Sequence, residues 1–133
     1  MTASDSSASA NTGISGPAIP GSVANNLGIV TTIAGSGSQG ATDNIGTEAS
    51  FNNPIGVAID RSGNIIVADY NNQLIRKIDG STYEVSTIAG SGSSGSANGV
   101  STNASFYRPY GVAIDSDGNI IVADQRNHLI RKI

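Results

Sequence analysis

The chain has 133 residues, and its seven basic and ten acidic side chains give a formal net charge of −3 at pH 7. An acidic chain without clustered lysine and arginine argues against a nucleic-acid partner, which requires a basic surface. The chain contains no cysteine, so neither a disulfide framework nor a thiolate site is expected, and no apolar run reaches the length that membrane insertion requires.

Residues 1–28 form a segment rich in serine, alanine, glycine and asparagine, with Asp5 as its single charged side chain. Such a composition predicts a flexible arm or linker. The segment lacks a cationic start followed by an apolar core, so we do not expect it to be an intact signal peptide.

A 49-residue block occurs twice in the rest of the chain. Val30–Ile78 and Val85–Ile133 align without gaps at an offset of 55 residues, and 32 of the 49 paired positions are identical. A period near 50 residues is typical of stacked or radial repeats, in which one unit cannot bury its apolar surface alone. We call the two copies the first and second repeat, and we call positions 55 residues apart counterparts.

Each repeat contains four short runs with the composition of β-strands. In the first repeat they are residues 29–34, 56–60, 64–69 and 74–78, and in the second repeat residues 84–89, 111–115, 119–124 and 129–133. A stretch rich in glycine and serine follows the first run of each repeat and ends at Phe51 or Phe106. These two aromatic side chains are predicted to anchor the stretch on the core.

A hairpin turn is predicted between the second and third runs, at Asp60–Gly63 and Asp115–Gly118. Aspartate comes first because its carboxylate accepts hydrogen bonds from downstream amides, and glycine comes fourth because it tolerates positive φ. The runs GVAI and IIVA are apolar on both faces, as expected for a sheet that is covered on both sides. The predicted fold class is therefore all-β, with four-stranded antiparallel propeller blades and two blades' worth of strands per chain.

The motif F-x-x-P-x-G-V-A-I-D-x-x-G-N-I-I-V-A-D-x-x-N-x-L-I-R-K-I occurs in both repeats and closely resembles the NHL repeat. The adjoining V-x-T-I-A-G-S-G resembles the long-loop version found in many bacterial, mostly secreted, repeat proteins. The resemblance implies a β-propeller in which GVAID is the innermost strand of a blade, NIIVAD and LIRKI follow, and VxTIAG is outermost. It also leads us to expect an extracellular or cell-surface location.

The order of the runs divides the chain into an arm, residues 1–28, and two NHL-type blades, residues 29–133. Within the latter, 29–34 is an outer strand, 51–89 a complete blade and 106–133 a blade that lacks its outer strand. We expect the open edge of the last blade to take the outer strand of another copy, head to tail. Since propellers need about four to eight blades to close, the propeller or fibre would be completed by oligomerisation, as a ring or a filament. The predicted assembly residues are Ile29, Val30, Thr32, Ile33, Leu129, Ile130, Arg131 and Ile133.

Three further sets of side chains were considered for binding or structural roles. Tyr107, Arg108 and Tyr110 replace uncharged residues of the first repeat, and they could line a face for a glycan or peptide or simply reflect drift between the repeats. Asn103 begins an N-x-S sequon and is a candidate glycosylation site. Asp69 and Asp124 are expected to cap the amides of the following loop and to pair with Arg76 and Arg131 between blades.

The leading functional hypothesis is a non-catalytic structural protein that assembles with copies of itself and needs no cofactor or metal. The sequence offers no nucleophile–base pair. The lyase members of the NHL family need several histidines around a metal, whereas His128 is the one histidine here. The alternatives are a propeller that binds a glycan or peptide, an excerpt of a longer NHL protein and, more remotely, an enzyme of the lyase or lactonase type.

Overall fold

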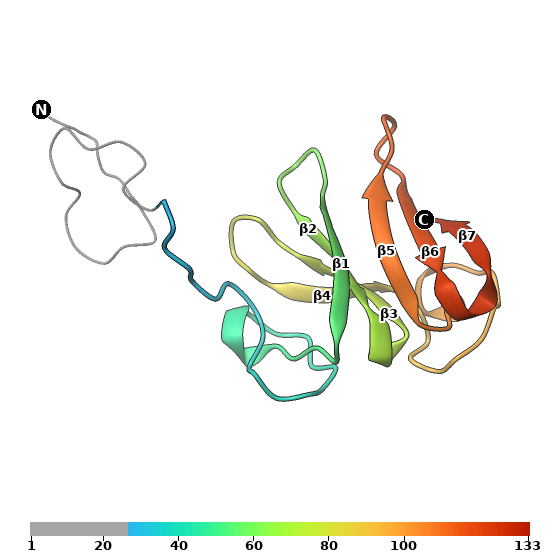
Figure 1. Ribbon diagram of the computed structural model, residues 1–133, viewed down its shortest axis with the longest axis horizontal. Helices are drawn as coiled ribbons and strands as arrows, with labels where there is room; N and C mark the ends of the chain where they lie inside the picture. The colour runs from blue at the N-terminus through green and yellow to red at the C-terminus, as the bar shows by residue number, and fades with distance from the viewer. Residues whose placement is uncertain (1–26) are drawn as a thin grey trace, which may run out of the picture. The chain divides into compact units, whose positions relative to one another are not determined.

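The computed structural model describes residues 27–133, and the chain divides into two compact units between Thr32 and Ile33. Nearly all of the predicted arm, residues 1–28, lies outside the described residues, so that prediction stays untested. Every strand described below belongs to the second unit, Ile33–Ile133 (Figure 1).

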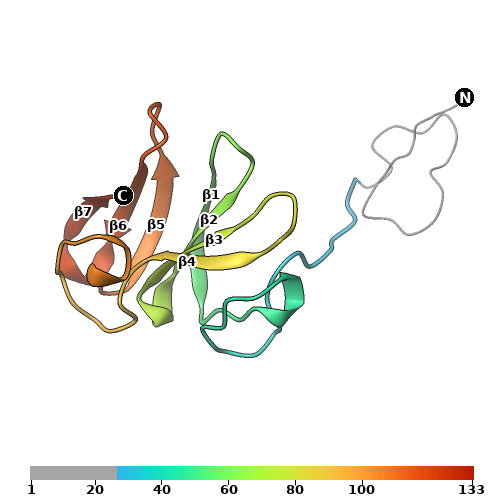
Figure 2. The same cartoon turned by 180° about the vertical axis from the view of Figure 1, so that it is seen from behind.

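The second unit is all-β and contains two antiparallel sheets (Figures 1 and 2). The first sheet has the order β1-β2-β3-β4 and consists of β1 (Pro54–Ile59), β2 (Ile65–Asp69), β3 (Leu74–Ile78) and β4 (Val85–Ala89). The second has the order β5-β6-β7 and consists of β5 (Pro109–Ile114), β6 (Ile120–Asp124) and β7 (Leu129–Lys132). Each strand pairs with its neighbour in sequence, which is the strand arrangement of a propeller blade. The predicted fold class is confirmed, and we call the sheets the first and second blade.

Short 3₁₀ turns lie in the connections of both blades. They are η1 (Gly46–Glu48), η2 (Tyr70–Asn72), η3 (Ser101–Asn103) and η4 (Gln125–Asn127). The residues that follow η2 and η4, Gln73 and His128, adopt left-handed backbone conformations with φ of 59° and 57°. The two repeats therefore share their loop geometry as well as their strands.

The predicted hairpin turn between β1 and β2 is confirmed. The Oδ1 atom of Asp60 accepts hydrogen bonds from the backbone N–H groups of Ser62 and Asn64, both at 2.9 Å. These bonds, with that from Asn64 first, lower the pKa of the Asp60 carboxyl. Gly63 completes the turn at a φ of +84° and donates its N–H to the Asp60 carbonyl. Asp115 forms the same turn between β5 and β6.

The two blades pack face to face and share one apolar cluster. The first blade contributes Ile66, Ala68, Ile75 and Ala89, and the second contributes Val122 and the preceding Phe106, which is 2% exposed. The inner strands β1 and β5 lie side by side in both views (Figures 1 and 2). A Cβ atom added at Gly56 would lie 2.6 Å from the Tyr110 carbonyl oxygen, so only glycine fits where these strands touch.

The other face of the first blade is covered by the long loop of its own repeat. Val67, Ile78 and Val85 form a second apolar cluster there with Ala49, and Phe51 packs against it. Phe106 occupies the equivalent place in the second repeat, within the cluster between the blades. The predicted anchoring role of the two phenylalanines is confirmed.

The predicted outer strand at residues 29–34 is absent from the described chain, because no strand or bridge is assigned there. Ile29 and Val30 are 46% and 92% exposed. A strand exists only when its N–H and C=O groups pair with a neighbouring edge, and the edge predicted for this segment belongs to another copy. The prediction of a strand is thus wrong for the single chain and stays untested for an assembly.

Candidate assembly interface

The outermost place of the first blade is filled by β4, which lies between β3 and the loop at residues 43–46. On one side β4 pairs with β3, from Ile78 opposite Val85 to Ile75 opposite Ala89. On the other side Val85 donates its N–H to the carbonyl of Asn44 at 2.8 Å. The backbone N–H and the Oγ1 of Thr87 both donate to the Asp43 carboxylate at 3.2 Å. The strand is therefore held from both edges.

The same place in the second blade is an open groove with a volume of about 420 Å³. Its walls are β7 with Ile133 on one side and the loop at residues 98–101 on the other, which is the counterpart of the loop that holds β4. The lining residues are Ala89, Asn98, Gly99, Ser101, Ala104, Phe106, Leu129, Ile130, Arg131, Lys132 and Ile133. We call this the outer groove, and it lies between the counterparts of the two segments that hold β4 in the first blade.

A buried arginine ties the long loop to the middle strands of each blade. In the first blade Arg76 Nη1 lies 2.7 Å from Asp69 Oδ2, both side chains are fully buried, and Asp43 lies 2.6 Å from Arg76 Nη2. The guanidinium also sits 4.9 Å from the centre of the Phe51 ring. These contacts satisfy the charge that burial would otherwise penalise.

The second blade has the same pair with a more open surrounding. Arg131 Nη1 lies 2.7 Å from Asp124 Oδ2, and its other amino group donates to Asn98, the counterpart of Asp43. The predicted pairing of these aspartates with the arginines is thus found, but within each blade and not between blades. The cap is also different from the prediction, because Asp69 Oδ1 accepts from the N–H of Asn52 in the loop before β1.

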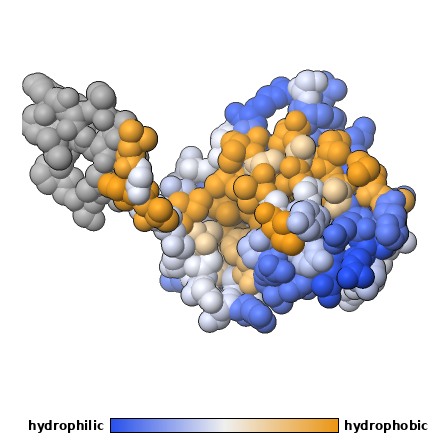
Figure 3. All heavy atoms as spheres, viewed as in Figure 1, coloured by the Kyte–Doolittle hydropathy of each residue, from blue (hydrophilic) through white to orange (hydrophobic). Residues whose placement is uncertain are grey.

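The first blade exposes apolar side chains on the face that lies away from the second blade. We call Pro54, Ile55, Val57 and Ile59 of β1 its leading face. Val57 and Ile59 are 62% and 60% exposed, while their counterparts Val112 and Ile114 pack against the first blade. Figure 3 shows an apolar band across the side of the molecule that carries the inner strands.

The second blade exposes the complementary surface, which we call its trailing face. Ile130 is 75% exposed and Leu129 is 44% exposed, whereas their counterparts Ile75 and Leu74 are 0% and 7% exposed beneath the second blade. A small cavity of about 180 Å³ opens on this face. It is lined by Ala123, Asp124, Gln125, His128, Leu129 and Ile130. The leading and trailing faces therefore expose counterparts of the side chains that form the interface between the two blades.

The residues predicted as a ligand face are drawn into that internal interface. The Arg108 guanidinium lies 5.2 Å from the centre of the Tyr70 ring, and Tyr110 meets the same ring edge-on at 6.0 Å. Tyr110 is still 48% exposed and Tyr107 36%. Arg108 and Tyr110 join the blades through Tyr70, and a role of the three residues in binding a glycan or peptide stays a prediction.

The remaining predicted site residues are placed as follows. Asn103 is exposed at the end of η3, so its side chain is accessible as the sequon requires. Thr32 is exposed and Ile33 half-buried. Arg131 pairs with Asp124 of its own blade, and Ile133 exchanges backbone hydrogen bonds with Ile120, the first residue of β6. Ile29, Val30 and Thr32 belong to the first compact unit and Leu129, Ile130, Arg131 and Ile133 to the second, so the pairing of the two sets stays a prediction.

Within residues 27–133, no group of three or more histidine, cysteine, aspartate or glutamate side chains is arranged to hold a metal ion. The part of the chain that the structure describes also has no helix long and apolar enough to span a bilayer.

The sequence analysis missed the leading face and the role of Asn98. Comparing counterparts could have singled out these residues, because Val57 and Ile59 are identical to Val112 and Ile114 and Asn98 aligns with Asp43. Which of two similar strands lies exposed cannot be read from sequence, since it depends on what packs beside each strand.

These blades define a β-propeller type of protein, and comparison with known proteins gives its family. The family model described as NHL repeat matches residues 51–78 and 106–133. The chain therefore belongs to the NHL-repeat proteins and carries two repeats, as predicted.

Similar proteins are much longer than this chain. Protein SUPPRESSOR OF QUENCHING 1, chloroplastic, of Arabidopsis thaliana is 38% identical over 94 residues, which are 71% of this chain and 9% of that protein. NHL repeat-containing protein 2 of Bos taurus is 36% identical over 95 residues, which are 69% of this chain and 13% of that protein. A structural genomics protein of unknown function from Bacteroides thetaiotaomicron aligns with a TM-score of 0.71 and 28% identity, over 76% of this chain and 26% of that one.

Proposed function

We propose that this chain is a non-catalytic structural unit that assembles head to tail, with a second copy supplying what each outer face lacks. The observation that carries the proposal is the outer groove beside β7. Its counterpart in the first blade holds the V-x-T-I-A strand at residues 85–89, and the same motif occurs at residues 30–34. The proposed occupant of the groove is therefore Val30–Ala34 of a second copy.

Hydrogen bonding in the first blade supports this choice of occupant. Thr87 binds Asp43 through its N–H and hydroxyl, and the counterpart pair is Thr32 with Asn98. The amide oxygen of Asn98 accepts hydrogen bonds as the carboxylate oxygen does. On the other edge, β7 presents backbone groups without a strand beside it within the described residues, and such an edge pairs readily with an added strand.

The exposed leading and trailing faces support assembly independently of the strand. At the interface between the two blades of one chain, Val112 and Ile114 are partly buried and Ile75 is fully buried. Their counterparts Val57, Ile59 and Ile130 are exposed to water. Burying a valine or isoleucine side chain contributes about 1.5–3 kcal/mol. A trailing face of one copy on the leading face of the next would therefore repeat a contact that the chain already makes, and repeated head-to-tail contacts form a ring or a filament.

Light scattering on the whole chain tests the proposal. We expect particles of several times the single-chain mass of 13.4 kDa at micromolar concentration. Thr32→Pro removes the backbone N–H that corresponds to the Thr87 N–H bound by Asp43. Because proline has no N–H to donate to a neighbouring segment, we expect this variant to remain a single chain. Thr31→Ala is the matched control, because the second repeat already has serine at the counterpart position.

A folded particle of single-chain mass would contradict the proposal. Because the curated relatives are many times longer than this chain, a second result is informative. If the single chain stays monomeric while several copies joined in tandem form one compact particle, the occupant of both faces is a blade of the same polypeptide, and assembly between copies is wrong.

A further inference from the structure

The contact between the two blades of one chain includes a hydrogen bond to a side chain that is almost completely buried. Gln73, which follows η2 in a left-handed conformation, is 8% exposed and accepts the Arg108 N–H through Oε1 at 2.6 Å. The next residue, Pro109, is fully buried in this contact, whereas its counterpart Pro54 is exposed on the leading face. The segment at residues 108–110 is thus seated on the first blade, with Gln73 as its acceptor.

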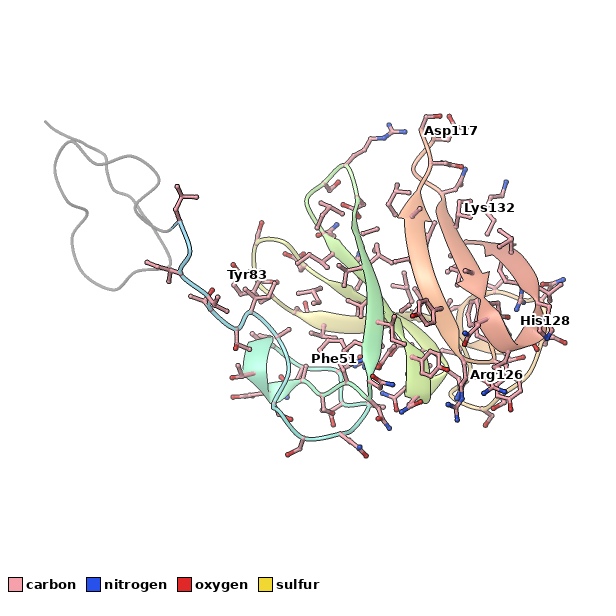
Figure 4. All side chains as sticks on the ribbon, in the orientation of Figure 1. Phe51, Tyr83, Asp117, Arg126, His128 and Lys132 are labelled. Atoms are coloured by element: carbon pink, nitrogen blue, oxygen red, sulfur yellow. The ribbon has the colours of Figure 1, made fainter. Side chains whose placement is uncertain are left out.

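The counterpart of Gln73 in the second blade is His128. Its backbone has the same left-handed conformation, with a φ of 57°, so its side chain leaves the chain in the same direction. His128 lines the 180 Å³ cavity of the trailing face, and Figure 4 places it on the side of the second blade away from the first. The counterparts of the residues that line this cavity are all buried in the first blade except Tyr70, which is half-buried.

We propose that this cavity receives the Asn53–Ile55 segment of a second copy and that neutral His128 accepts the N–H of Asn53. The inference rests on the proposed function, and it adds a named acceptor and a dependence on protonation to the junction between copies. Neutral imidazole has one nitrogen that accepts, whereas protonated imidazole has two donors and none that accepts. Protonation therefore leaves the Asn53 N–H without a partner at a buried contact, which weakens association.

Among the residues that line the cavity beside His128, Asp124 carries the carboxylate, and that carboxylate is already paired with Arg131. Asp124, on the same cavity wall, already accepts from Arg131 and Asn127 through Oδ2 and from Tyr107 through Oδ1. Arg126 precedes His128 by two residues and is a cation (Figure 4). The docking segment of the second copy, Asn53–Ile55, is uncharged, since asparagine stands where the second repeat has Arg108.

The junction between copies would differ in this respect from the one inside the chain. Glutamine accepts a hydrogen bond whatever the pH, so the internal contact at Gln73 does not respond to protons, whereas an imidazole acceptor is lost when the ring is protonated. An assembled state that requires neutral imidazole binds fewer protons than the dissociated state. Lowering the pH therefore favours dissociation.

The test is the dissociation constant of the whole 133-residue chain, measured by sedimentation at about pH 8 and about pH 5.5, on either side of the range in which imidazole titrates. We expect the constant to be about tenfold higher at the lower pH, the effect of a buried donor left without its acceptor. Turn aspartates with lowered pKa values keep their charge in this interval. They are Asp60, Asp79 and Asp115.

His128→Gln is the decisive variant because it gives the junction the acceptor that the internal contact already uses. We expect it to assemble equally at both pH values, and His128→Ala to assemble weakly at both. Equal constants for the unchanged chain, or a pH dependence that persists in His128→Gln, would overturn the inference while leaving head-to-tail assembly intact. Failure of the unchanged chain to associate at either pH would refute the proposed function itself. Circular dichroism at both pH values identifies any loss of fold.

Discussion

The two blades carry nearly the same core residues, yet the first is buried where the second is open. Ile75 is fully buried and its identical counterpart Ile130 is 75% exposed. The difference arises because the second blade covers the first, and within the described residues no third sheet covers the second. A blade thus gains much of its buried area from its neighbour, as expected for repeat architectures.

The arginine clusters provide the sharpest test of this comparison. Arg76→Ala would leave the fully buried Asp69 without its partner, at a cost of about 3–5 kcal/mol in the free energy of unfolding. Arg131→Ala should cost less, because its surroundings are more open to water. Urea unfolding at low protein concentration gives both values. Equal losses would show that the second blade is as well covered as the first.

Truncating the counterpart isoleucines measures the cover that one blade gives the other. Ile75→Ala creates a cavity in the shared cluster and should lower the free energy of unfolding by about 2–5 kcal/mol. Ile130→Ala removes an exposed side chain and should change it by less than about 0.5 kcal/mol in the dissociated chain. Under assembling conditions Ile130→Ala should instead raise the dissociation constant. A large loss in the dissociated chain would mean that Ile130 is covered in solution.

Substitutions at the counterpart glycines Gly56 and Gly111 distinguish the steric effect of a close contact between blades from the general effect of replacing glycine by alanine. Gly56→Ala forces a Cβ against the Tyr110 carbonyl and should destabilise the chain by about 1–3 kcal/mol, whereas a Cβ on Gly111 meets nothing within 4 Å. Thermal unfolding of both variants checks the prediction. If Gly111→Ala becomes about as harmful as Gly56→Ala under assembling conditions, the leading face of another copy lies where we place it.

The turn aspartates should give a small effect of equal size in both blades. Hydrogen bonds from Asn64 and Asn119 lower the pKa values of Asp60 and Asp115 in the folded chain. A carboxyl with a lowered pKa in the folded state adds stability at neutral pH, and that stability is lost as the pH falls through the folded-state pKa. Asp60→Asn and Asp115→Asn should therefore each flatten the acid limb of the stability curve, measured by urea unfolding from neutral to acid pH. A response from only one of them would break the symmetry of the turns.

Local features of the blades were predictable because each depends on residues close in sequence. The turn at Asp60–Gly63 needs only a carboxylate and a glycine at the right spacing. The strand order follows from short connections, which join sequence neighbours. The pairing of Asp69 with Arg76 was predicted, but it was expected between blades. The two side chains meet within one blade because β2 and β3 pair in register.

The candidate site was predictable only in part. Leu129 and Ile130 were recognised as an open edge from the order of the strands, while the docking of Arg108 and Tyr110 onto Tyr70 was not foreseen. That contact joins residues on different blades, and its geometry depends on how closely β1 and β5 approach. The outer strand expected at residues 29–34 is missing for the same reason, since a strand needs a partner edge as well as a suitable composition.

The sequence by itself determined the family, the repeat unit and the all-β class, because these follow from spacing, alternation and turn residues repeated at an offset of 55. Only the tertiary structure decided which of two similar surfaces is buried. Burial is a property of a residue together with its neighbours, so Ile75 and Ile130 read alike in the chain and differ in the fold.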